Sequence, residues 1–115
     1  MAIGDYTDVR MIGPVSVPVS VANAGPPANF IWIIKQILIV NTNPSGTVGV
    51  QCAIETSPAN NANARVVDIN IQPRDVEMIN THLVLSGATG DKFVYVSTAG
   101  TQATITVCGL ARQIS

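Results

Sequence analysis

The fold is decided by residues 30–55, which read FIWIIKQILIVN over 30–41, TNPSG over 42–46 and TVGVQCAIE over 47–55. The first run predicts a long strand, and the Asn, Pro and Gly residues that follow it predict a turn. In the third run Val48, Val50, Cys52 and Ile54 share one face of a strand, because successive side chains of a strand alternate between its two faces. The stretch therefore predicts two strands joined by a turn.

The rest of the chain continues this pattern. Further strands are expected over 64–72, 76–85, 92–97 and 102–111, separated by a polar loop at 57–63 and by turns that contain Gly or Pro. The chain has 15 Val, 13 Ile and 10 Thr but only 4 Leu, and β-branched residues favour strands. No window shows a 3.6-residue period. The sequence predicts an all-β fold, an antiparallel β-sandwich or jelly roll over residues 30–115.

Residues 1–29 differ from this region and are interpreted as an extended N-terminal arm. They hold four of the 7 prolines, and Val15, Val17, Val19 and Val21 alternate with smaller or polar residues. Proline cannot donate to a central ladder, so the segment suits a sheet edge or a neighbour's surface. The arm is expected to add to the sheet of a neighbouring subunit, leaving a sandwich that folds without it.

Charge and hydropathy exclude several classes of protein. Only 11% of the 115 residues are charged, and the 6 Lys and Arg are scattered singly, so no basic patch for nucleic acid is present. The apolar content of 47% is too high for a disordered chain. The longest apolar runs are too short to span a membrane, and the first ten residues do not resemble a signal peptide. We expect no nucleic-acid partner and no membrane partner.

The residues that carry chemistry are too dispersed to predict an active site. His82, the single histidine, lacks a nearby His or Cys at metal-ligand spacing, and no nucleophile motif is present. Cys52 and Cys108 are expected on opposite-facing positions, as two free thiols of a protein made in a reducing cytoplasm. Asp75 and Glu77 share one face of a strand and are expected to be solvated, with cation binding as the alternative. The sequence predicts no catalytic residue, no cofactor and no metal.

Apolar residues beyond the needs of one core predict a subunit interface instead. Residues 37–40 and 93–96 are apolar on both faces, and such strands are normally buried on both faces. A neighbouring subunit can cover the second face. The chain is expected to form a homo-oligomer, with a trimer as the number suggested by analogy. The candidate interface residues are Val15, Val17, Val19, Val21, Trp32, Leu38, Val40, Val94 and Val96.

Three segments resemble small β-sandwich proteins of the structural modules of tailed bacteriophages. These segments are residues 33–42 with 47–50, residues 83–99, and residues 102–110, so the resemblance extends over about residues 30–112. The chain departs from that pattern at Ser86 and Ala111, where acidic residues are expected, and Ala88 and Thr89 lengthen a turn. The departures leave the sandwich pattern intact.

The resemblance implies a non-enzymatic virion protein that is made in the host cytoplasm. A capsid decoration (cement) protein, which binds the major capsid protein or other virion proteins and stabilises the assembled shell, is the first hypothesis. A tail, connector or baseplate subunit is the alternative. A carbohydrate-binding or adhesin-like module is the third, and it requires exposed rings at Trp32 and Tyr95.

Overall fold

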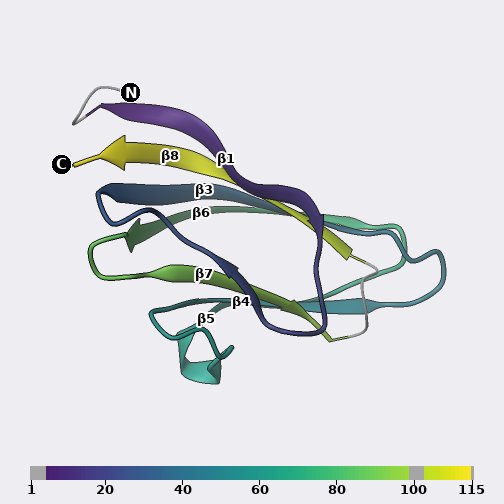
Figure 1. Cartoon of the computed structure of the whole chain (residues 1–115). Coiled ribbons are helices and arrows are strands. Elements are labelled where there is room, and N and C mark those ends of the chain that lie inside the picture. Colours follow the sequence, from purple (N-terminus) through teal and green to yellow (C-terminus); the bar gives the residue numbers. More distant parts are fainter. Residues whose placement is uncertain (1–4, 99–102, 115) are drawn as a thin grey trace.

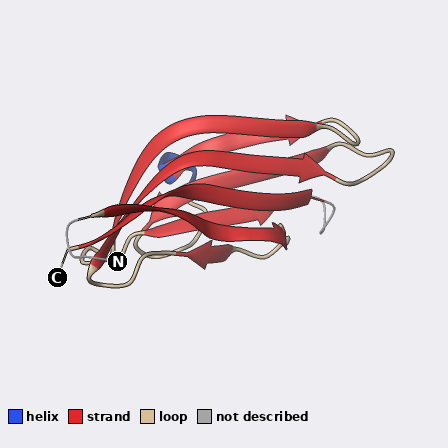
Figure 2. Ribbon diagram, turned by 90° about the horizontal axis from the view of Figure 1, so that it is seen from above, coloured by secondary structure: helices blue, strands red, loops and turns tan. Residues whose placement is uncertain are grey.

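The computed structural model describes residues 5–98 and 103–114 and shows two antiparallel four-stranded sheets packed face to face (Figures 1 and 2). The predicted all-β sandwich is confirmed. Over these residues the structure contains eight strands and one short 3₁₀ helix, in the order β1 (Tyr6–Ser16), β2 (Ala22–Ala24), β3 (Phe30–Asn41), β4 (Val48–Glu55), η1 (Ala62–Ala64), β5 (Arg65–Ile71), β6 (Val76–Ser86), β7 (Lys92–Ser97) and β8 (Ala103–Gln113).

Each sheet combines strands that are far apart in the sequence. The first sheet has the strand order β1-β8-β3-β6 and the second has the order β2-β7-β4-β5. Every strand pair is antiparallel, and β3, in the middle of the first sheet, pairs with β8 on one side and β6 on the other. The six strands expected from the sequence are all present, with bounds that agree to within two residues.

The core fills the space between the two sheets, as alternation along each strand requires. In β3, Ile34, Ile37 and Ile39 turn inward and are fully buried, and Phe93 of β7 faces them from the second sheet. The principal members of the core are Ile12, Val17, Ile34, Ile37, Ile39, Val48, Val50, Cys52, Val67, Ile71, Leu85, Phe93, Ala103, Ile105 and Val107.

One buried polar side chain, Asn41, ties three chain segments together at the end of β3. Its Nδ2 donates to the carbonyl oxygens of Gly46, Ile71 and Gln72 at 2.9, 2.9 and 3.1 Å. Its Oδ1 accepts from the backbone N–H of Asn43 at 2.9 Å. The amide group therefore fixes the turn after β3 against the end of β5, in the second sheet.

The N-terminal segment is not a separate arm, which corrects the division at residue 29. β1 pairs with β8 along its length, and Val17 donates its N–H to Ala103 O at 2.8 Å before the chain crosses to the second sheet. There Ser97 donates to Pro18 O at 2.7 Å, and β2 pairs with β7. The prolines are tolerated because they stand at a bend, a crossing and a turn, outside regular ladders. Residues 5–29 are thus part of the sandwich.

Among the described residues, no helix is long and apolar enough to cross a membrane. The one helical segment, η1, lies in the loop between β4 and β5, on the outer side of the second sheet (Figure 1).

Candidate interaction surface

The outer face of the first sheet is the most unusual surface of the molecule. Residues that alternate with the core positions of β1, β8, β3 and β6 point away from the second sheet. Cross-strand pairing places them in rows, for example Asp8, Leu110, Ile33 and Val84, or Arg10, Cys108, Gln36 and Asn80. Two apolar patches and a polar band between them make up this face.

Patch 1 consists of Leu38, Val40, Val76 and Met78. Leu38 lies opposite Met78, and Val40 lies opposite Val76, across the β3–β6 pair. Val76 is 48% exposed and Met78 is 57% exposed, while Leu38 and Val40 are partly exposed. Four large apolar side chains therefore adjoin one another in contact with solvent.

Patch 2 consists of Ile31, Ile33, Val84 and Leu110, at the other end of the same face. Ile33 stands between its two cross-strand partners, Val84 on β6 and Leu110 on β8. Val84 is 54% exposed, and the other three are partly exposed. The two patches together leave both ends of the outer face apolar.

The polar band consists of Arg10, Lys35, Gln36, Asn80, His82 and Cys108. The register of β3 shifts against both neighbouring strands between Ile34 and Gln36. Lys35 is an extra residue relative to β8, whereas β6 has one extra residue relative to β3 between Asn80 and Leu83. Lys35 Nζ lies 3.0 Å from Nδ1 of His82. Gln36 Nε2 donates to Met78 Sδ at 3.4 Å, so the polar band is bonded to patch 1.

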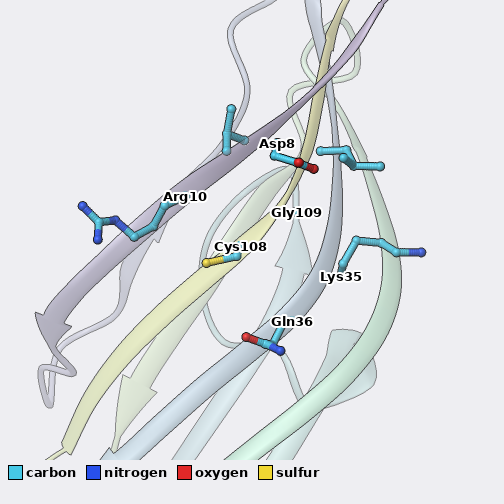
Figure 3. Close-up of a pocket in the computed structure, with 8 residues that line it drawn as sticks. Asp8, Arg10, Lys35, Gln36, Cys108 and Gly109 are labelled. Atoms are coloured by element: carbon cyan, nitrogen blue, oxygen red, sulfur yellow. The ribbon is translucent and has the colours of Figure 1, made fainter.

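A broad, open hollow of about 590 Å³ lies over the polar band between β1, β8 and β3. Figure 3 shows Asp8 and Arg10 on β1, Cys108 and Gly109 on β8, and Lys35 and Gln36 on β3. One acidic and two basic side chains line it. The hollow is a shallow depression of a sheet face, suited to a protein contact in which a neighbour's side chains enter it.

The interface residues predicted on β3 do not all lie on the same face of the sheet. Leu38 and Val40 lie on the outer face, within patch 1, as the two-faced pattern of 37–40 requires. Trp32 turns the other way and packs against the core, where it lies opposite Leu85 and Ala111. The indole is therefore partly buried against the core, and the carbohydrate-binding hypothesis loses one of the fully exposed rings that it requires.

Val94 and Val96 are also buried within this one chain, which corrects their place in a subunit interface. Both lie on the outer face of the second sheet, opposite Ala53 and Gln51. The loop 56–64 folds back on this side, and Asn60 Nδ2 donates to Gln51 Oε1 at 2.8 Å. The chain's own loop thus lies where a neighbouring subunit was expected.

The loop 56–64 is held in place by one carboxylate. Glu55 Oε2 accepts the backbone N–H groups of Ala59 at 3.0 Å and Asn60 at 2.9 Å, and Oε1 accepts that of Asn61 at 2.8 Å. The hydrogen bonds from Ala59 and then Asn61 lower the pKa of Glu55, with smaller contributions from Asn60 and from the charge of Arg65. The sequence shows that this segment is a polar loop, but it does not show that Glu55 anchors it.

The valines of the N-terminal segment do not form one row. Val17 is fully buried in the core, whereas Val19 is 60% exposed and Val15 and Val21 are each 40% exposed. The alternation is broken because the chain crosses between the two sheets at this point. Val17 is therefore a core residue, and the other three remain accessible.

The two cysteines are free and face different environments, as the sequence predicts. Cys52 belongs to the core, and burial raises the pKa of its thiol to about 12. Cys108 lies on the outer face, partly exposed, beside Arg10 and Gln36. Their sheets and faces differ, so no disulfide joins them.

The remaining chemistry-bearing residues are used locally. His82 is exposed on β6 and bonded to Lys35. Asp75 Oδ1 accepts from the N–H of Val76 at 2.8 Å, and Asp91 Oδ2 accepts from the N–H of Ser86 at 2.9 Å. Within residues 5–98 and 103–114, no group of three His, Cys, Asp or Glu residues is placed to hold a metal ion.

Comparison with known proteins adds a weak likeness. Neither a protein-family model nor a curated protein matches the chain. Among solved structures, infectious bursal disease virus Gx strain matches with 11% identity and a TM-score of 0.40, covering 94% of this chain and 30% of that chain. The Gt strain matches with 11% identity and a TM-score of 0.24, covering 93% and 29%. The chain thus spans less than a third of each matched chain, and at these TM-scores the likeness assigns neither family nor function.

Proposed function

We propose that this chain is a non-enzymatic virion structural protein of a tailed bacteriophage, a capsid decoration protein that docks through the outer face of its first sheet. The resemblance of residues 30–112 to phage β-sandwich proteins supports the class of protein. The two apolar patches on the outer face support attachment through that face.

The observation that carries the proposal is the exposure of Val76, Met78 and Val84 on a face that also holds Leu38 and Val40. Monomeric soluble proteins rarely leave adjoining large apolar side chains in water, and contiguous patches of this kind mark interaction sites. The patches lie on paired strands, whose backbone hydrogen bonds hold their side chains in fixed positions. Apolar patches on both sides of a polar band fit a repeated contact with an assembled shell.

A protein that binds only the assembled shell stabilises it by mass action. Burying the two patches on docking removes apolar area from water, which favours the complex by roughly 25 cal/mol per Å². The polar band would fix the orientation, because buried charges and amides must find partners. These roles require no reacting group.

The test is co-sedimentation with purified capsids that lack this protein. The wild-type chain is expected to co-sediment with the capsids, and Val40→Asp, in patch 1, is expected to weaken binding by about tenfold or more, since a desolvated unpaired carboxylate costs over about 1.4 kcal/mol. Val40→Thr, which has the same shape, gives a milder loss. Val66→Asp is the matched control, because Val66 is exposed on β5 of the other sheet.

Melting curves of all three variants establish that each is folded. Equal binding by Val40→Asp and Val66→Asp would remove the outer face from the proposal. Absence of wild-type binding would overturn the decoration role. Imaging of labelled protein on whole virions separates a shell position from a tail, connector or baseplate position, and a tail position would favour that alternative.

A further inference from the structure

Strand β6 presents a long, unpaired edge of the first sheet. It has 11 residues, contains neither Pro nor Gly, and among the described residues pairs only with β3. An unpaired strand edge offers a row of free backbone N–H and C=O groups to another strand. The free edge of β6 is therefore able to pair with another strand.

The other three sheet edges are less suited to pairing. β1 contains Pro14, which lacks an N–H, and its register against β8 shifts twice. β2 has only 3 residues, and β5 has 7 and is followed closely by Pro73. Natural proteins protect edges by such devices, namely proline, irregular register and short length. β6 has neither proline nor short length, and its register against β3 shifts only once, between Asn80 and Leu83.

The sequence of β6 is self-complementary about its middle residue, Thr81. In an antiparallel pair of two β6 strands related by a two-fold axis at Thr81, each residue before the centre faces one after it. Asn80 then faces His82, Ile79 faces Leu83, and Met78 faces Val84 of the other copy. Polar residues meet polar ones and apolar residues meet apolar ones, the arrangement that stabilises cross-strand pairs. Only the end pairs, Glu77 with Leu85 and Val76 with Ser86, are mixed.

The same pairing continues the pattern of the outer face from one copy to the next. Even-numbered residues of β6 point outward, and a two-fold axis perpendicular to the sheet keeps them on the same side in both copies. Met78 of patch 1 then adjoins Val84 of the second copy's patch 2. Asn80 and His82 join the two polar bands into one. The polar band then runs across all eight strands, and patch 1 of each copy continues into patch 2 of the other.

We propose that β6 pairs antiparallel with β6 of a second copy of this chain, about a two-fold axis at Thr81, and forms one continuous eight-stranded sheet. The occupant of the edge is a second copy because the residue pattern of β6 complements its own reverse. The pairing gives a dimer, in place of the trimer expected by analogy. It does not depend on the virion role.

The test is a charge pair placed across the expected axis. Met78 and Val84 lie six residues apart on one strand, too far to touch within one copy, but they face each other twice between copies. Met78→Lys with Val84→Lys places like charges opposite each other, and the dissociation constant of the dimer should rise by about tenfold or more. Met78→Lys with Val84→Glu places opposite charges together and should keep the constant within about threefold of wild type.

Sedimentation velocity of the full-length chain over a micromolar concentration range gives the constants. Both positions are more than half exposed, so both double variants should fold, and melting curves check this. Val40→Asp, on the outer face but one strand inside the edge, should remain dimeric. A monomeric wild-type chain overturns the pairing, and so do equal constants for the two double variants.

The outcomes separate this proposal from the decoration role. A wild-type dimer that does not bind capsids leaves the β6 pairing standing and overturns the decoration role. A wild-type monomer that binds capsids does the reverse.

Discussion

Single side chains in this protein hold segments that the backbone alone would leave loose, and Asn41 is the strongest case. Replacing it by Ala leaves the carbonyls of Gly46, Ile71 and Gln72 without their donor in a buried position. We expect Asn41→Ala to lower the free energy of unfolding by about 1–3 kcal/mol, the usual cost of an unsatisfied buried polar group. Urea denaturation measures this. Asn70→Ala, on the exposed side of β5, is the control, and an equal loss there would contradict the role of Asn41.

Glu55 predicts a pH dependence at the same scale. Its pKa is lowered in the folded chain, so its stabilisation of the loop is complete above the ordinary glutamate pKa and is lost as pH falls through the lowered pKa. Glu55→Gln should lose this stabilisation at neutral pH. Hydrogen exchange of the Ala59, Asn60 and Asn61 amides reads it out, as protection factors. Protection that falls in acid equally in wild type and Glu55→Gln would exclude the carboxylate as the cause.

At the scale of elements, the segment from β1 to β2 decides whether the N-terminal region is an arm or part of the sandwich. Val17 and Val19 stand two residues apart, yet one is fully buried and the other is 60% exposed. Val17→Ala should lower the free energy of unfolding by about 2–3 kcal/mol, from lost apolar burial and the cavity left behind. Val19→Ala should change it by less than about 0.5 kcal/mol. Equal small changes would restore the detachable arm.

The sequence predicts where the strands lie better than it predicts which strands pair in a sheet. Alternation located β3, β4 and β7 almost to the residue, because strand periodicity is a local property of the chain. β1 and β2 were missed because prolines at a bend and a crossing resemble the prolines of a detached segment. The pairing of β1 with β8 joins the two ends of the chain, and no local pattern encodes it.

For a related reason, some of the predicted interface residues are accessible and others are buried within the chain. A run that is apolar on both faces predicts that something covers the second face, but it does not identify the cover. For Leu38 and Val40 the second face is partly open to solvent, whereas Val94 is fully buried within the single chain, on the face where the loop 56–64 is bonded to Gln51. The sequence of that loop is polar, like that of many loops, and the loop is held by hydrogen bonds between Glu55 and later backbone amides. Whether a polar loop folds back over a sheet depends on such tertiary contacts, which local sequence patterns do not show.

At the scale of the whole molecule, the sandwich has two outer faces of different kinds. On the second sheet the loop 56–64 folds back, and Asn60 of that loop is bonded to Gln51, which also donates to Asp68. The first sheet is uncovered and apolar at both ends. This asymmetry gives the molecule one side with two exposed apolar patches, suited to docking, and one side against which its own loop folds.

The two thiols differ so much in accessibility that one of them can be labelled selectively. The high pKa and full burial of Cys52 keep its sulfur protonated and out of reach of a maleimide, since only an accessible thiolate reacts readily. Cys108 stands partly exposed on the outer face of the first sheet, opposite Gln36. A single fluorophore or spin label can therefore be attached to the unmodified chain, on the surface whose contacts are in question, and its environment will register whatever comes to cover that side.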